Sequence, residues 1–375
     1  MEMAKSIVWR DETLVIRKYD VKRDQEKVLE LWQAAFGNQI SSSLWQWKYI
    51  ENPYSTTILI CENAKGMPVV LYGGIPFTSI CFGRTIRMIH LSDIMSHPDY
   101  RGSGLFIQTA NAYFETFGNI DDICIMYGFP GKYHFDIGAK YLNYSQLGDG
   151  AAFFRGDCKN IKSLKHIISG SIHLAHAPSH SSDQTNYSSD KVIHHSEHTN
   201  YSSDKAAHCC DKTSHNYDQT SHDFDQIWRN ASTDYPLSVI RNSAYVEWRY
   251  FNHPEKTYEV WCYKTRFNKD SKAFIVIQIK GRKAVIVDIL VQNSEKIFRD
   301  FLGNIASMLL KRGIETVEVW VPHDHFLAVF FQGCGVKRTK EPIGIIPTVR
   351  LFDDMLDIKQ VCQNFYYSMG DGDLL

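Results

Sequence analysis

The stretch LSDIMSHPDYRGSGLF, residues 91–106, decides the fold of the chain. Its first residues complete an apolar run that is typical of a strand, and Leu105 opens a segment whose apolar residues follow helical spacing. Gly102 and Gly104 lie in the turn between them. A strand that leads through such a turn into a helix presents backbone N–H groups at the positive end of the helix dipole, where they bind phosphate groups. The stretch therefore predicts a pyrophosphate site.

Around this stretch, residues 1–158 alternate strand patterns with helical patterns. The predicted order is strand, two helices, three antiparallel strands, helix, strand, helix and strand. The helix after the glycine-rich turn is expected at Leu105–Phe117, and the three antiparallel strands are expected at Thr57–Glu62, Val69–Phe77 and Ile86–Met95. This order implies an α/β fold with a mostly antiparallel mixed sheet and helices on both of its faces.

The last part of the chain repeats the first part. Trp47–Pro53 (WKYIENP) matches Trp248–Pro254 (WRYFNHP) at an offset of 201 residues. Further on, Asp93 in its strand matches Asp288 in another apolar strand. Such a shared order of motifs indicates that a domain has been duplicated.

We therefore expect two tandem domains, at residues 1–158 and 227–375, joined by a linker at residues 159–226. From about residue 171 to residue 226 the linker is rich in Ser, His, Asp, Asn and Thr, and this part of it holds nine of the sixteen histidines. It has too few large apolar residues to offset the entropy of ordering its backbone, which predicts disorder. A metal-binding interpretation rests on the histidines and on Cys209-Cys210, but no fixed ligand spacing recurs, so no metal is expected.

The composition excludes several classes of function. The formal net charge is −1, with 41 basic and 42 acidic side chains, which provides no basic surface for nucleic acid or an anionic membrane. The nine cysteines form no CxxC pair, so neither a disulfide framework nor a zinc site is expected. No signal-peptide pattern opens the chain, and no apolar stretch is long enough to cross a bilayer. We expect a cytoplasmic protein whose partner is a small molecule; these features do not fix its oligomeric state.

The glycine-rich loop resembles the acyl-CoA signature of the GNAT superfamily, (Arg/Gln)-x-x-Gly-x-(Gly/Ala), with Arg101 and Gly104 in matching positions. Phe106 departs from the signature, which has a small residue there. The Trp47–Pro53 element and the segment Gly128-Phe129-Pro130 extend the likeness. The chain is similar to a group of tandem GNAT-like bacterial proteins linked to surface polysaccharide synthesis.

This resemblance implies two tandem GNAT-like domains and an acyl-CoA-dependent N-acyltransferase. Acetyl-CoA is the expected acyl donor, and the amine of a small molecule is expected to attack its thioester directly. An amino sugar or a nucleotide sugar is the acceptor class that the resemblance suggests. The resemblance also implies that the main chain of Ile94–Ser96 pairs with the pantetheine arm. The residues expected to bind the cofactor are Ile94, Met95, Ser96, Arg101, Gly102, Ser103, Gly104, Leu105 and Phe106.

The reaction requires a base for the attacking ammonium and an acid for the leaving thiolate. Asp93 is the candidate base, because it lies in an apolar strand near the expected thioester. A structural role is the alternative, since Asp288 occupies the matching position in the second domain. For the acid, the resemblance points to the region of Tyr127, Tyr133 and His134, and the sequence does not choose among them.

The second domain lacks the glycine-rich loop. After the strand that contains Asp288, the chain reads Gln292-Asn293-Ser294-Glu295, with no glycine and with an acidic residue that would repel phosphate. We interpret this domain as a degenerate copy that keeps the fold without the cofactor. Its closing segment Gly370–Asp373 resembles the C-terminal signature of the same group of proteins.

Two other functions stay open. A tRNA-dependent aminoacyl transferase can also pair two GNAT-like domains, although the intact loop and the balanced charge count against it. A non-catalytic CoA-binding or scaffold protein in a polysaccharide biosynthesis complex would be compatible with a degenerate second domain.

Overall fold

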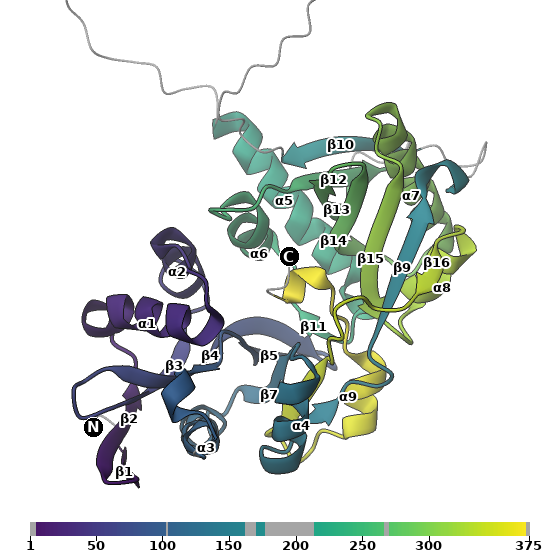
Figure 1. Cartoon of the computed structure of the whole chain (residues 1–375). Coiled ribbons are helices and arrows are strands. Elements are labelled where there is room, and N and C mark those ends of the chain that lie inside the picture. Colours follow the sequence, from purple (N-terminus) through teal and green to yellow (C-terminus); the bar gives the residue numbers. More distant parts are fainter. Residues whose placement is uncertain (1–4, 103, 162–169, 177–213, 266–269, 373–375) are drawn as a thin grey trace, which may run out of the picture.

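The structure, a computed structural model, describes residues 5–102, 104–161, 170–176, 214–265 and 270–372. These residues form two mixed sheets that are flanked by helices, one in each half of the molecule (Figure 1). The α/β fold expected from the sequence is confirmed. The predicted strand Thr57–Glu62 and the predicted helix Leu105–Phe117 have the bounds that the sequence indicated.

The first sheet has ten strands. Its main path, from one edge to the other, is β1 (Lys5–Trp9), β2 (Glu12–Lys18), β3 (Thr57–Glu62), β4 (Pro68–Cys81), β5 (Arg84–Leu91), β7 (Ile123–Gly128), β17 (Thr348–Leu351) and β8 (Ser145–Gln146). Two short strands pair with β4 off this path, β6 (Met95–Ser96) and β11 (Leu237–Val239). Among the described strands of this sheet, β5 and β7 make the one parallel pair.

The second sheet has seven strands in the order β10 (Ser171–His176), β12 (Glu259–Lys264), β13 (Ser271–Lys280), β14 (Lys283–Val291), β15 (Thr316–Pro322), β9 (Ala151–Asp157) and β16 (Lys337–Thr339). The helices are α1 (Val21–Phe36), α2 (Ser42–Tyr49), α3 (Leu105–Phe117), α4 (Lys132–Tyr141), α5 (Ser214–Ala231), α6 (Ser243–Val246), α7 (Glu295–Lys311), α8 (Phe326–Gly333) and α9 (Ile358–Asn364). Short helical turns are η1 (Pro98–Tyr100), η2 (Cys158–Asn160), η3 (Ser232–Asp234), η4 (Glu247–Phe251) and η5 (Met369–Asp371).

The two halves exchange strands. Strand β9 comes from the first part of the chain but lies between β15 and β16 of the second sheet, as Figure 1 shows. Conversely, β17 comes from the last part of the chain and lies between β7 and β8 of the first sheet. The expected division into residues 1–158, 159–226 and 227–375 therefore does not coincide with the two sheets, because backbone pairing places residues 151–157 and 348–351 in the opposite halves.

The expected linker also contains regular structure. Strand β10 begins at residue 171, where we expected disorder to begin, and it pairs with β12 from Ser171↔Lys264 to His176↔Val260. Its backbone hydrogen bonds to the sheet supply the order that its composition does not predict. The TNYSSDK repeats, most of the histidines of this region and Cys209-Cys210 lie outside the described residues.

Local chemistry explains the limits of α1. The side chain of Asp20 accepts a hydrogen bond from the backbone N–H of Arg23, and Gly37 ends the helix in the left-handed conformation at φ 76°. Within the first turn, buried Asp24 accepts two hydrogen bonds of 2.7 Å from Arg17 on β2. The ion pair satisfies a carboxylate that burial would otherwise penalise, and it fixes α1 to β2 of the first sheet.

Helices cover both faces of the first sheet. On one face α1 packs over strand residues such as Ile58 and Leu71, in a core that continues into the second half of the molecule. On the other face α3 packs over Leu59 and Val70. The alternation of neighbouring residues between the two faces follows from the period of a strand.

Equivalent tryptophans join the two halves. The indole N–H of Trp47 donates to the carbonyl of Trp248 at 2.9 Å, and the indole N–H of Trp248 donates to the carbonyl of Trp47 at 3.0 Å. The two rings stack with centroids 4.9 Å apart and planes 14° apart. A reciprocal contact between equivalent residues is what a two-fold axis produces. The repeated sequence elements therefore meet at the junction of the two halves.

Two negative findings concern the described residues only. In that part of the chain no helix has both the length and the apolar character that crossing a membrane requires. Nor do three or more His, Cys, Asp or Glu side chains gather there in a group that could hold a metal ion.

Because the two halves exchange strands, we expect them to unfold together in one transition. We expect Val349→Asp to lower the free energy of unfolding by about 4 kcal/mol or more, because Val349 is fully buried on β17 and the new carboxylate would have no partner there. Urea denaturation followed by circular dichroism and tryptophan fluorescence measures this change. A single transition is expected, since β17 connects both halves.

The matched control is Val329→Asp, at a side chain of α8 that is 66% exposed. This change should alter the free energy of unfolding by about 0.5 kcal/mol or less. Equal effects of the two substitutions, or two separate unfolding transitions, would contradict the cooperative role of β17.

Candidate functional site

A gap opens in the first sheet where the parallel pairing of β5 and β7 stops. The paired residues run from Arg87↔Ile123 to His90↔Tyr127. The chain then bends away, with Asp93 in the left-handed conformation at φ 53°, and β6 pairs with β4. A left-handed aspartate is uncommon and is stabilised by its surroundings. The predicted continuous strand Ile86–Met95 is therefore wrong at this bend, which separates β6 from β7.

A cavity of about 490 Å³ lies at this gap. One part of its wall comes from α1 and from Asn38 just beyond it, another part from α4 and the loop after it, and a third from β17. Because α1 and α3 cover opposite faces of the sheet, the cavity is lined from both faces. The lining residues are Trp32, Phe36, Asn38, His90, Leu91, Ser92, Asp93, Ile94, Met126, Tyr127, Gly128, Phe129, Pro130, His134, Tyr144, Thr348, Val349 and Arg350.

The glycine-rich loop lies between β6 and α3. Gly102 and Gly104 both have positive φ, at 70° and 77°, and a Cβ atom built on either would meet no other atom within 4 Å. Gly104 also precedes α3 without a capping side chain. The loop is therefore open to a ligand, and this geometry fits the approach of a pyrophosphate group to the backbone at the start of a helix. Ser103 lies outside the described residues.

Arg101 holds this loop in place. Its guanidinium donates to the carbonyl oxygen of Ser96 at 3.2 Å and to that of Ala35 at 2.7 Å. These bonds connect the loop to β6 and to the last turn of α1. The structure thus gives Arg101 a role in the loop's position, and Arg101 does not line the cavity.

Leu105 and Phe106 begin α3, and each packs inward. Leu105 is fully buried. The Phe106 ring, at the position where the GNAT signature has a small residue, lies 5.8 Å from the Tyr72 ring and 5.4 Å from the His134 ring, measured between centroids. The larger side chain therefore fills space between α3, β4 and α4.

The strand residues of the expected pantetheine site divide into two groups. Ile94 lines the cavity, whereas Met95 and Ser96 pair with Leu71 and Val70 of β4. Because one edge of β6 pairs with β4, the other edge of β6 faces the gap.

Asp93 lines the cavity and is held by two side chains of α2. Its carboxylate lies 2.5 Å from the Lys48 ammonium nitrogen and 2.6 Å from the Tyr49 hydroxyl oxygen. To take a proton from an acceptor amine, the Asp93 carboxylate would have to accept it while it also accepts the hydrogen bonds from Lys48 and Tyr49. In the second half, Tyr250 donates to Asp288 at 2.8 Å in the same way. The Tyr–Asp bond thus connects α2 to the bend before β6 in the first half, and η4 to β14 in the second half.

The three acid candidates lie in different surroundings. Tyr133 is 83% exposed and does not line the cavity. Tyr127 is buried and lines it, and its hydroxyl oxygen has no hydrogen-bond partner among the described residues. His134 also lines the cavity, with its ring parallel to that of Tyr144. Of the expected catalytic residues, the structure brings together Asp93, Tyr127 and His134.

Burial shifts the pKa values of Tyr127 and His134 in opposite directions. It raises the pKa of Tyr127 well above its usual range, so the phenol keeps its proton at neutral pH. It lowers the pKa of His134 to about 4, so the imidazole is neutral at the same pH. At neutral pH, Tyr127 is thus a neutral phenol and His134 a neutral imidazole.

Sequence reasoning missed the aromatic side chains of α1 and all of β17. Trp32 and Phe36 are four residues apart, their ring centroids lie 4.7 Å apart with the planes tilted by 59°, and the Trp32 indole donates to Asn38 at 3.3 Å. Helical spacing could have placed the two rings on one face of α1. No local signal could have assigned Arg350 to the cavity, because its strand reaches the first sheet only through the exchange.

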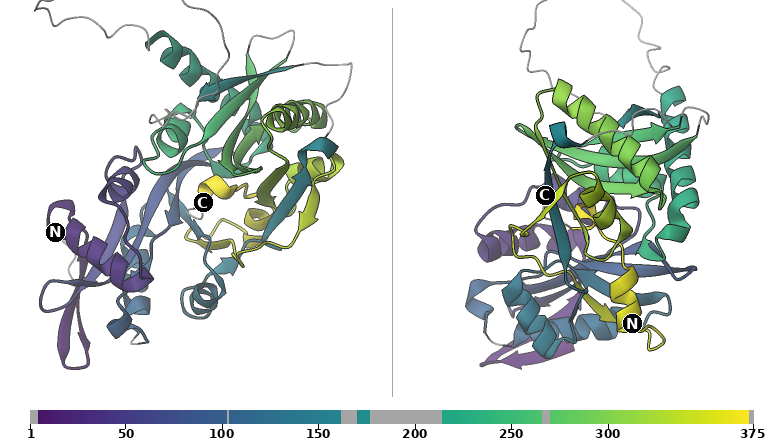
Figure 2. Two further views of the ribbon diagram at one scale, coloured as in Figure 1. Left: turned by 45° about the horizontal axis from the view of Figure 1, so that its top comes forward. Right: turned by 90° about the vertical axis from the view of Figure 1, so that its right-hand side faces the viewer.

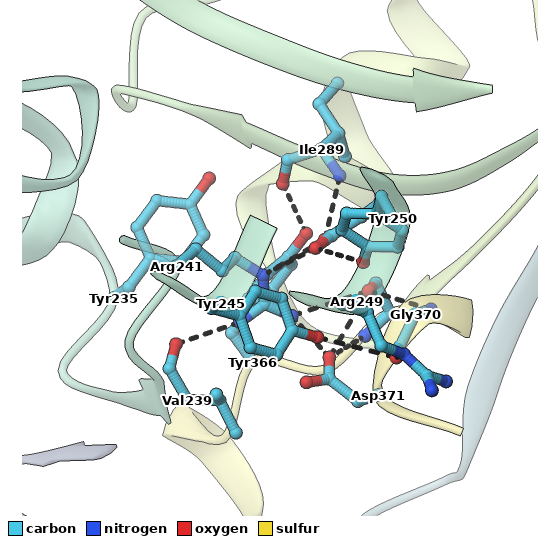
Figure 3. Close-up of polar contacts among 12 residues, drawn as sticks. Tyr235, Val239, Arg241, Tyr245, Arg249, Tyr250, Ile289, Tyr366, Gly370 and Asp371 are labelled. Atoms are coloured by element: carbon cyan, nitrogen blue, oxygen red, sulfur yellow. Dashed lines mark hydrogen bonds and ion pairs between the residues drawn. The ribbon is translucent and has the colours of Figure 1, made fainter. Parts of the chain in front are cut away.

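In the second half, the corresponding place is filled by the chain itself. Parallel pairing of β14 and β15 stops at Ile286↔Val319, and η5 contacts both strands beyond that point. The Tyr366 hydroxyl donates to the Ile289 carbonyl at 2.5 Å (Figure 3). A Cβ atom at Gly370 would lie 2.0 Å from the Tyr250 hydroxyl oxygen, so the segment is closely packed.

A buried charge cluster holds this C-terminal segment. Arg241, fully buried, donates to Asp288 at 3.0 Å. It also donates to Asp371, which Figure 3 labels beside it. Both views of Figure 2 place η5, the yellow turn near the C-terminal end, at the junction of the halves. Where the first half has a cavity, the second half has its own chain end.

Comparisons of this chain with known protein families and solved structures agree with this architecture. Residues 16–137 match the acetyltransferase (GNAT) domain family. A search by sequence among curated proteins gave no match.

Solved structures of similar fold cover nearly the whole chain. One is a conserved protein of unknown function from Enterococcus faecalis V583, described as a probable N-acyltransferase, with a TM-score of 0.63 and 12% identity over 90% of this chain and 73% of that one. GCN5-related N-acetyltransferases from Kribbella flavida and Anabaena variabilis ATCC 29413 each have a TM-score of 0.58 and 12% identity over 91% of this chain, and over 71% and 73% of their own. At such identity the likeness concerns the fold. Residues 16–137 therefore form a domain of the GNAT acetyltransferase family.

Proposed function

We propose that the chain is an acyl-CoA-dependent N-acyltransferase that uses acetyl-CoA and acylates the amine of a small molecule. The observation that carries the proposal is the cavity at the gap between β6 and β7, which is lined from both faces of the first sheet. The open glycine loop lies on the α3 face. An acyl-CoA bound at the loop could extend its thioester into the gap, and an amine could enter from the α1 face.

The proposed reaction is a direct transfer. The amine nitrogen attacks the thioester carbonyl carbon, a C–N bond forms, the C–S bond breaks, and CoA leaves as a thiol after taking up a proton. We assign the proton donor as Tyr127, because it is protonated at neutral pH and lines the cavity. Asp93 is the proposed base or, with Lys48 and Tyr49, an anchor for α2. The acceptor class suggested by resemblance is an amino sugar or a nucleotide sugar.

We further propose that the two halves are duplicated GNAT-like domains, of which the second does not bind acyl-CoA. The η5 segment fills its gap, and the turn before α7 is capped by Ser294 and has no glycine. The reciprocal tryptophan contact supports a duplication. On this view, one chain binds one acyl-CoA.

Binding of the donor tests the proposed function. In calorimetric titration with acetyl-CoA, the wild type should bind about one molecule per chain. Gly104→Glu should abolish binding, because a carboxylate would stand at the pyrophosphate position and repel it.

The control for Gly104→Glu is Gly83→Glu, in the turn between β4 and β5. Gly83 has φ 86° and no atom within 4 Å of an added Cβ, so the backbone strain of the two substitutions is matched. Gly83→Glu should bind acetyl-CoA as the wild type does. A folded wild type that binds none would refute the proposed function, and two molecules per chain would refute the closed second site.

Removal of the proposed acid should slow turnover without loss of binding. We expect Tyr127→Phe to lower kcat about a hundredfold, a typical contribution of general acid catalysis, while the affinity for acetyl-CoA is retained. Because burial raises the pKa of Tyr127, the wild-type rate should not fall through loss of this proton between pH 7 and about pH 9. Steady-state kinetics with a responsive amine measures both effects.

Tyr133→Phe provides the comparison, since Tyr133 is exposed on α4 outside the cavity. Its kcat should equal that of the wild type. If Tyr127→Phe also keeps full activity, Tyr127 is not the acid.

A further inference from the structure

Arg350 brings a positive charge from the second half to the cavity of the first. It lies on β17 opposite Met126 of β7, so both side chains lie on the face that α3 covers. It lines the cavity together with its neighbours Thr348 and Val349.

No protein carboxylate neutralises this charge in the part of the chain that the structure describes. Among the described residues, its guanidinium donates a hydrogen bond to the carbonyl oxygen of Leu142 at 2.9 Å. The Cζ atom of Arg350 lies 3.9 Å from the centroid of the Phe114 ring and 4.9 Å from that of the Phe352 ring. Stacking on rings leaves the N–H groups at the edge of the guanidinium available for an anion.

Two other arginines, whose side chains are at most 11% exposed, are paired with acids. Arg17 binds Asp24 and Glu62, and Arg241 binds Asp288 and Asp371. Accordingly, the bond to Asp24 raises the pKa of Arg17, whereas burial lowers the pKa of Arg350. A half-buried cation is costly without a counter-ion.

The cavity itself offers no spare acid. Its one lining carboxylate among the described residues is Asp93, which is bound by Lys48 and Tyr49. The anion that matches Arg350 therefore has to come from a ligand.

That anion is not the pyrophosphate of CoA. Phe114, on which Arg350 stacks, lies nine residues beyond Leu105 at the start of α3, which corresponds to about 13 Å along a helix. The glycine-rich loop is at the near end of α3, so Arg350 is too far from it to share the same phosphates.

We propose that Arg350 forms an anion subsite, remote from the glycine-rich loop, that binds a carboxylate or phosphate carried by the acyl group or by the acceptor amine. This inference rests on the proposed function, because it assigns a charge to one of the two substrates of that site. It makes Arg350 a specificity-determining residue that the second half supplies.

Paired probes that differ in one anionic group test the proposal. In the donor arm, succinyl-CoA and acetyl-CoA are titrated calorimetrically into the protein. In the acceptor arm, glucosamine 6-phosphate and glucosamine are titrated into protein saturated with CoA. In one arm the wild type should bind the anionic probe about tenfold to a hundredfold more tightly than its neutral counterpart, as a charged hydrogen bond would provide.

Arg350→Met should abolish that preference and keep the affinity for acetyl-CoA, which also shows that the variant is folded. Arg350→Lys should keep part of the preference, because it retains the charge and loses the planar pair of donors. Arg282→Met is the matched control, since Arg282 is 74% exposed and pairs with Glu315. It should leave the preference unchanged.

A preference for succinyl-CoA would assign the anion to the acyl group, and a preference for glucosamine 6-phosphate would assign it to the acceptor. Absence of preference in both arms, or a preference that Arg350→Met retains, would overturn the subsite while acetyl-CoA binding upholds the proposed function. If the wild type binds neither acyl-CoA, the proposed function fails and this inference fails with it.

Discussion

The backbone hydrogen bonds of β9 and β17 are the constraint on which the rest of the structure depends. Each strand completes a sheet that belongs mostly to the opposite half of the chain. Unpaired strand edges in a buried sheet would leave polar groups without partners, so neither sheet is complete by itself. Removal of residues 227–375 would take β11 and β17 from the first sheet as well as removing most of the second.

The exchange also explains the asymmetry of the two halves. The Trp47–Trp248 contact and the Tyr–Asp bond recur on both sides of the junction. In the first half the gap between the parallel strands holds a cavity, and in the second half η5 and Tyr366 occupy it. The C-terminal segment is fixed there by Arg241 and Asp371. The same framework can thus give one half a site and the other half a closed core.

The site depends on side chains that three different parts of the chain supply. The α1 aromatic residues, the β5–β7 gap and the β17 residues meet because the sheet carries α1 on one face and α3 on the other. Burial in this setting shifts the pKa of Tyr127 upward and that of His134 downward, which separates two residues that the sequence left equal.

The sequence by itself determined the α/β class, the repeat, and the position of the glycine-rich loop, because these rest on local periodicity and on the conformational freedom of Gly102 and Gly104. It also indicated Asp93, Tyr127 and His134 as residues of one region. Only the tertiary structure decided that Tyr133 points away, that the strand before the loop bends at Asp93, and that Arg350 belongs to the cavity. The boundary at residue 158 could not reveal the exchange of β9 and β17. Local pattern predicts that a strand forms, whereas the sheet that accepts it is chosen by long-range backbone pairing and by the packing of both faces.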